Sequence, residues 1–153
     1  MSVSTKTTNL AGRIIGWIIS VFLTLLAFGF YYAHQAWSTG FFTASFSTGL
    51  AVLLYVSVLY LAVNATAKLL TDQKRIVITV ELIGAILTGL ATLSLFVVFP
   101  FSFAHVGDVL PSLIRPLLSW ITNDIGRIAY GLGVFGSIVA IIADSARLIT
   151  GRI

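Results

Sequence analysis

Long apolar runs separated by short polar links dominate the chain. The clearest run follows Lys74 and Arg75, extends from Ile76 to Ala104, and contains a single carboxylate, that of Glu81. A run of this length with one ionisable residue predicts a transmembrane helix, because about 20 predominantly apolar residues are needed to cross the hydrocarbon core. Other runs in the chain have similar length and character, so a polytopic membrane protein is expected.

Four transmembrane helices are predicted, at about residues 13–37, 45–70, 76–99 and 125–149. The first two links are short, which makes consecutive spans antiparallel neighbours. No polar block of domain size interrupts the pattern, so residues 1–153 are interpreted as one all-α integral membrane domain surrounded by the lipid bilayer.

The link between the third and fourth spans is less regular. Pro100, Pro111 and Pro116 all fall within it, and proline removes a backbone donor from a helix. Apolar residues still recur at helical spacing over residues 109–122, which favours a short amphipathic helix that lies in the interface or re-enters the membrane. Asn123 or Asp124 is then expected to cap the fourth span.

Composition supports membrane insertion. Hydrophobic residues make up 58% of the chain and charged residues only 9%, whereas soluble domains carry about 25% charged residues. Cysteine is absent, which excludes disulfides, thiolate metal sites and cysteine nucleophiles. The net charge of +4 includes no basic run longer than Lys74-Arg75, so nucleic acid is not an expected partner.

The positive charges are distributed unequally across the four predicted spans. One side, which holds both termini, carries seven of the nine basic residues: Lys6, Arg13, Lys68, Lys74, Arg75, Arg147 and Arg152. The other side carries only Arg115 and Arg127. Because cytoplasmic loops are enriched in Lys and Arg, both termini are predicted to be cytoplasmic.

Four polar residues form a predicted layer inside the membrane near the cytoplasmic face: Asn64, Glu81, Asp144 and Arg147. From the helical rise, Glu81 lies roughly 9 Å beyond Arg75, and Asp144 roughly 4 to 5 Å before Arg147. An intramembrane charge costs at least about 2.5 kcal/mol on insertion scales unless it is compensated. The two carboxylates either share a proton or cation, or pair with nearby cations: Asp144 with Arg147, and Glu81 with Arg75 or a neighbouring helix. The second interpretation is favoured.

His34 and His105 lie at the opposite boundary of the membrane. Two histidines on non-consecutive helices could hold a metal or both axial positions of a haem, although interfacial side chains are the simpler interpretation. Aromatic residues crowd the same boundary, over residues 28–46 and 96–103. They predict an interfacial belt, or alternatively a patch for a partner subunit or pigment. The favoured interpretation includes no metal site and no other cofactor.

No Walker motif, nucleophile elbow or zinc-protease motif occurs, and no enzymatic activity is expected. The sequence favours a non-catalytic subunit or scaffold of a larger membrane assembly, with other integral membrane subunits or further copies of itself as partners. One alternative is an oligomeric channel or a proton- or cation-coupled transporter that uses Glu81 and Asp144. A further alternative is a haem- or pigment-binding membrane subunit that uses His34 and His105.

Overall fold

The computed structural model describes residues 3–151, with side chains described from residue 10 onward. Four long helices follow one another: α1 (Val3–Ala36), α2 (Thr48–Leu70), α3 (Lys74–Val98) and α4 (Asn123–Thr150). Each is long and apolar enough to cross a membrane. The predicted all-α architecture with four membrane-length helices is therefore confirmed, and it indicates an integral, multi-pass membrane protein.

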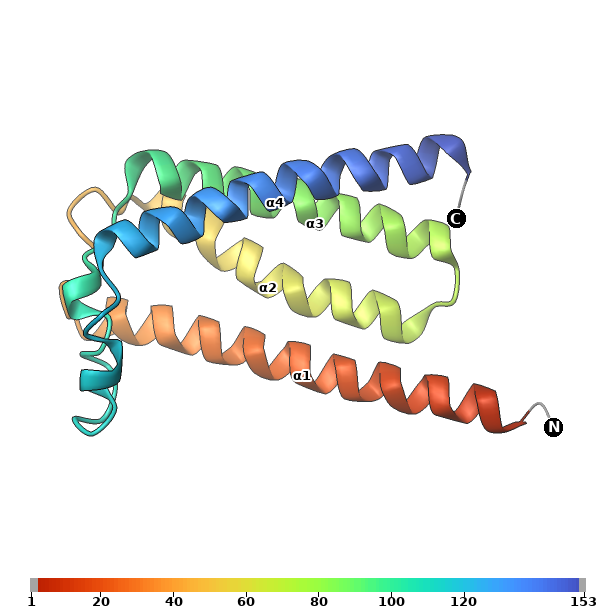
Figure 1. The fold of residues 1–153 in the computed structure, drawn as a ribbon, viewed down its shortest axis with the longest axis horizontal. Coiled ribbons are helices and arrows are strands. Elements are labelled where there is room, and N and C mark those ends of the chain that lie inside the picture. Colours follow the sequence, from red (N-terminus) through yellow and green to blue (C-terminus); the bar gives the residue numbers. More distant parts are fainter. Residues whose placement is uncertain (1–2, 152–153) are drawn as a thin grey trace.

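The helices run alternately in opposite directions (Figure 1). Both termini and the link at residues 71–73 lie at one end of the molecule, which we call the termini end. The two longer connections, residues 37–47 and 99–122, meet at the other end, which we call the loop end. Every basic residue with a described side chain lies at the end of the molecule where the sequence predicts it. The side chain of Lys6 and the whole of Arg152 fall outside the described parts.

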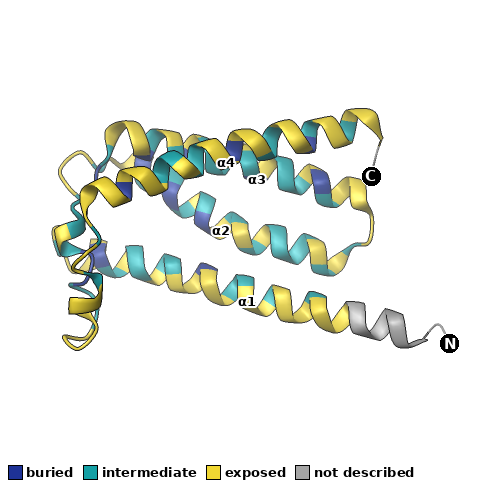
Figure 2. Ribbon diagram, viewed as in Figure 1, coloured by how far each residue is buried: buried dark blue, intermediate teal, exposed yellow. Residues whose placement is uncertain are grey.

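The four helices form a row and not a closed bundle. Among the described residues, Cα atoms of the long helices approach within 8 Å only between consecutive helices: α1 with α2, α2 with α3, and α3 with α4. Toward the N-terminus, α1 diverges from α3 and α4 (Figure 1). Few span residues are buried, from 6% in α1 to 22% in α2, and apolar side chains cover the outside (Figure 2). An exterior of this kind suits lipid, because the hydrocarbon is as apolar as the side chains.

Close backbone approach holds α3 against α4. A Cβ atom added to Gly133 would lie 3.1 Å from Cγ2 of Thr92, and one added to Gly89 would lie 3.2 Å from Cβ of Ser137. Small residues at a helix interface allow the backbones to pack closely, which is the main source of helix association in lipid. Gly136, on the same helix as Gly133, has nothing within 4 Å of its added Cβ.

The ends of the helices differ from the prediction in detail. α4 is capped by Thr122, whose hydroxyl accepts from the Ile125 N–H at 3.5 Å, and not by Asn123 or Asp124. Asn123 is occupied elsewhere, since its side-chain oxygen accepts from the Phe103 N–H at 2.8 Å. α1 begins at Val3, and its membrane-length apolar part covers Leu10–Ala36, close to the predicted span of about residues 13–37.

The helix expected over residues 109–122 is not formed. This segment consists of turns and one short 3-10 helix, η2 (Arg115–Leu118); a second 3-10 helix, η1 (Phe103–His105), precedes it. Pro111 and Pro116 lack the N–H groups that an α-helix would use here. Their carbonyls instead accept local bonds, from the Ile114 N–H at 2.9 Å and the Ser119 N–H at 3.3 Å.

Candidate functional site

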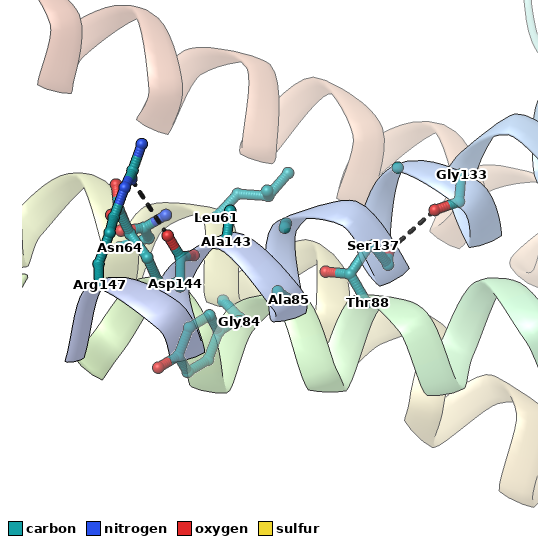
Figure 3. A pocket seen from close by; sticks show the side chains of 14 residues that line it. Leu61, Asn64, Gly84, Ala85, Thr88, Gly133, Ser137, Ala143, Asp144 and Arg147 are labelled. Carbon is teal, nitrogen blue, oxygen red and sulfur yellow. Dashed lines mark hydrogen bonds and ion pairs between the residues drawn. The ribbon is translucent and has the colours of Figure 1, made fainter. Parts of the chain in front are cut away.

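A groove of about 560 Å³ runs along the row between α2 and α4, with α3 as its floor (Figure 3). Small side chains line most of its length: Gly84, Ala85, Gly133, Gly136, Ser137, Ala140 and Ala143. At its termini end it is lined by Asn64, Glu81, Asp144 and Arg147. The structure thus places the four residues of the predicted polar layer in a single groove.

Both carboxylates of the groove are ion-paired. Glu81 Oε1 lies 2.7 Å from Nζ of Lys68 on α2, and Asp144 Oδ1 lies 3.2 Å from Nη1 of Arg147 on its own helix. The sequence indicates the second pair and leaves two options for Glu81. The structure selects the neighbouring helix over Arg75, because the pairing of α2 with α3 brings Lys68 beside Glu81. The favoured interpretation of paired carboxylates therefore agrees with this geometry.

Asn64 contributes a side-chain amide to the groove. Its side-chain oxygen is shielded from solvent and has no donor in the described part of the chain. A buried acceptor without a donor typically costs about 1–3 kcal/mol. The same end of the groove holds Asp144 and Arg147 (Figure 3). An acceptor is therefore left over beside the two ion pairs.

Beyond this polar end, two hydroxyl groups of the groove donate to backbone carbonyls. Ser137 donates to the Gly133 carbonyl of its own helix at 2.8 Å, and Tyr60 donates to the Val80 carbonyl of α3 at 3.1 Å. Hydroxyls bonded in this way add little polarity to the surface they face. The polar character of the groove is thus concentrated near Asn64, Glu81 and Asp144.

Arg13 joins α1 to α2 at the termini end, a contact the sequence analysis did not identify. Its guanidinium donates to the Lys68 carbonyl at 2.8 Å and the Leu69 carbonyl at 2.6 Å, and it pairs with Asp72. The last carbonyls of a helix lack intrahelical partners and carry partial negative charge. Arg13 donates hydrogen bonds to these carbonyls from a neighbouring helix, and no local sequence pattern predicts such a contact.

The two histidines have separate partners. His34 is 1% exposed, its Nδ1 lies 2.6 Å from the Thr39 hydroxyl, and its Nε2 has no partner in the described part of the chain. His105 pairs through Nδ1 with Asp108 at 2.9 Å. Its ring lies against Gly40, where an added Cβ would meet ring atoms at 3.2–3.3 Å and where φ is +90°.

Among the described residues, no three potential His, Cys, Asp or Glu ligands gather around one point. A shared metal or haem on His34 and His105 stays a prediction.

Aromatic rings fill the loop end in an arrangement that the sequence did not resolve. Phe41, 2% exposed, is at its centre. Its ring contacts the rings of Phe30, Tyr31, His34, Phe42, Phe101 and Phe103. Backbone bonds join the two connections beside it, from the Ser102 N–H to the Phe41 carbonyl at 2.7 Å and from the Thr43 N–H to the Pro100 carbonyl at 3.0 Å. We call these rings the aromatic cluster.

Many of the aromatic residues thus pack on one another, while Tyr32, Trp37 and Trp120 remain exposed as belt residues would be.

Comparison of the chain with protein-family models, with curated proteins and with solved structures gave no match.

Proposed function

We propose that this protein is a non-catalytic subunit of a larger membrane assembly, with both termini in the cytoplasm. The orientation rests on the positive charges: Lys68, Lys74, Arg75 and Arg147 lie at the termini end, together with Arg13. Only Arg115 and Arg127 lie at the loop end among the described residues. In polytopic proteins the end richer in Lys and Arg is cytoplasmic.

The groove between α2 and α4 is the observation that carries the proposal. It combines small side chains with two carboxylates and an amide, and it is open in the isolated chain. In a bilayer, lipid tails cannot satisfy such groups, whereas another helix can pack against the small residues and supply hydrogen bonds. A partner helix therefore completes the interior that the open row leaves unfinished.

Transport through the chain has less support. Glu81 and Asp144 are each neutralised by a cation, and the hydroxyl of Ser137 donates to its own helix. A conduction pathway needs polar groups, water or a gate along its whole length. The pair of Glu81 with Lys68 fits a structural role in holding α3 against α2, whereas the pair of Asp144 with Arg147 lies within α4.

The test makes the same change, glycine to leucine, at two positions of the chain. Gly136→Leu adds bulk to the groove at a position where an added Cβ atom meets nothing within 4 Å, so the chain should remain folded while its partner is displaced. Gly16→Leu places the same bulk on α1, where an added Cβ atom also meets nothing within 4 Å, and should keep the partner. Each tagged variant is purified from its native membrane in mild detergent, and the stoichiometry of co-purifying membrane proteins is measured against wild type.

A membrane partner present at fixed stoichiometry in wild type and Gly16→Leu, but at least tenfold depleted in Gly136→Leu, supports the proposal. A homogeneous preparation without a partner overturns it. Ion flux in reconstituted vesicles that disappears in Glu81→Gln or Asp144→Asn also overturns it, in favour of transport. An absorbing chromophore in the purified protein, lost in His34→Ala, overturns it in favour of pigment binding.

A further inference from the structure

A second groove, of about 630 Å³, lies along α1 in the half of the helix nearer the loop end. We call it the α1 groove. Small and large apolar residues alternate along its α1 side: Leu23, Leu26, Ala27, Gly29, Phe30 and Ala33. Val109 and Leu110 also line it, because the connection at residues 99–122 reaches past the end of α1 (Figure 1). The described lining is apolar apart from Tyr31, so the groove suits a hydrocarbon.

The length of the α1 groove matches one leaflet of a membrane. Its α1 side extends from Leu23 to Ala33, and ten residues of helix correspond to roughly 15 Å. The hydrocarbon core of a bilayer is about 30 Å thick, so the groove covers the half of the core nearer the loop end. A single acyl chain of that leaflet lies at the same depth and has the same direction as α1.

Arg115 places a cation beside the part of the groove formed by the connection. Its Nε donates to the Leu110 carbonyl at 2.9 Å and its Nη2 to the Asp108 carbonyl at 3.0 Å, so the guanidinium is held next to Val109. Arg115 forms no ion pair with a carboxylate of the described residues, since the Asp108 carboxylate pairs with His105. Its Nη1 makes no hydrogen bond within the described part of the chain.

Net charge does not select the ligand here, because the loop end holds two arginines and two aspartates: Arg115, Arg127, Asp108 and Asp124. The position of each charge decides instead. The guanidinium of Arg127 lies over the Phe99 ring, 4.8 Å from its centre, and Arg127 does not line the α1 groove. Arg115 is therefore the cation that an anionic group at the end of this groove would meet.

The residues around Arg115 indicate that it lies at the level of lipid headgroups. Leu113 is 87% exposed, and Leu117 and Trp120 are exposed on the same connection. This segment lies outside the four membrane-length helices. Exposed apolar side chains next to a cation suit the boundary between hydrocarbon and water, where tryptophan is also enriched.

We infer that the loop end binds a phospholipid of the adjacent leaflet, with one acyl chain in the α1 groove and the phosphate on Arg115. Guanidinium groups form strong charge-assisted hydrogen bonds with phosphate oxygens, and Nη1 is the donor that Arg115 has to offer. The site lies apart from the groove between α2 and α4, so it does not depend on the subunit function proposed above.

The experiment uses the full chain in phosphatidylcholine vesicles that contain a small fraction of phosphatidylglycerol with a photoreactive group in its acyl chain. After illumination, mass spectrometry identifies the labelled peptide. Gly29→Phe adds bulk to the α1 groove, and Gly16→Phe adds the same bulk elsewhere on α1; an added Cβ atom meets nothing within 4 Å at either position. We expect labelling between Leu23 and Ala33 in wild type and Gly16→Phe, with at least a tenfold loss in Gly29→Phe. Equal labelling of the two variants, or labelling confined to other parts of the chain, overturns the inference.

A second arm tests recognition of the phosphate. Diacylglycerol with the same photoreactive chain has no phosphate, so it should label the α1 groove at least fivefold less than phosphatidylglycerol does. Arg115→Gln should remove this preference, whereas Arg127→Gln should keep it. Equal labelling of wild type by both probes overturns the role of Arg115.

A third variant separates phosphate binding from support of the connection. Arg115→Lys retains the charge but cannot reproduce both hydrogen bonds to the Asp108 and Leu110 carbonyls. If Arg115 binds phosphate, Arg115→Lys should keep most of the preference for phosphatidylglycerol. If Arg115 only holds the connection in place, lysine loses the preference as fully as glutamine does, and the inference is overturned.

Discussion

The two ends of the molecule are held together by different means. At the loop end, aromatic rings pack around Phe41, and backbone hydrogen bonds join residues 41–43 to residues 100–102. At the termini end, the contacts between helices are polar: Arg13 bonds to the end of α2, and Lys68 pairs with Glu81. The loop end buries large side chains, while the termini end contains the open polar groove.

This difference assigns the stability of the fold mainly to the loop end and the binding of a partner to the termini end. The rings at the loop end pack on one another around Phe41, so this end fixes the positions of the helices without needing a partner. The ion pairs at the termini end are partly exposed and contribute little individually, but they keep charged groups at the surface of a groove. Substitutions at the two ends should therefore affect different measurements.

The largest effect on stability is expected for Phe41→Ala. Removing a buried aromatic side chain leaves a cavity and typically costs about 3–5 kcal/mol. Phe135, which is 67% exposed on α4, provides the control, because Phe135→Ala should cost about 0.5 kcal/mol or less. Reversible unfolding in bicelles measures both. Equal losses for the two variants would show that the loop end has no packed core.

A smaller effect is expected for Arg13→Ala. The variant removes charged hydrogen bonds to the last carbonyls of α2, which are worth about 1.5–3 kcal/mol in total. Arg13→Lys keeps the charge but lacks the forked donor geometry, so it should recover only part of the loss. Unfolding free energy and amide hydrogen exchange at the end of α2 provide the measurement. Full recovery by lysine would mean that charge alone matters here.

The smallest effect is expected for the ion pair of Lys68 with Glu81. Its members are 49% and 24% exposed, so water screens their interaction. A double-mutant cycle with Lys68→Met and Glu81→Gln should give a coupling free energy of about 1 kcal/mol or less. A coupling well above about 2 kcal/mol would contradict this, and would mean that the termini end is as dry as the loop end.

The four long helices could be predicted from the sequence because each apolar run is long enough to cross the hydrocarbon core of a membrane. The polar layer could also be predicted from the sequence, since the helical rise places Asn64, Glu81 and Asp144 at similar depth. The ion pair of Asp144 with Arg147 follows from a three-residue spacing on one helix. These features depend on local spacing, which a single sequence records directly.

The remaining features depend on how separate helices align. The choice of Lys68 for Glu81 requires the register of α2 against α3, and the position of Arg13 requires α1 to lie beside the end of α2. Thr122 caps α4 because Asn123 bonds to Phe103, which is 20 residues away. The aromatic cluster needs two connections to meet, and periodicity within either one carries no information about that meeting.

Close backbone approach between consecutive helices has a consequence for synthesis. As the chain emerges from its N-terminus, α1 and α2 can pair before α3 exists, and Arg13 can reach Asp72 as soon as that residue appears. Phe42, however, must wait for its backbone partner Phe101. At about 5–20 residues per second, this delay lasts roughly 3 to 12 seconds. During that interval the first connection presents uncovered aromatic rings, so newly made chains are most open to premature contacts at the end that later becomes the best packed.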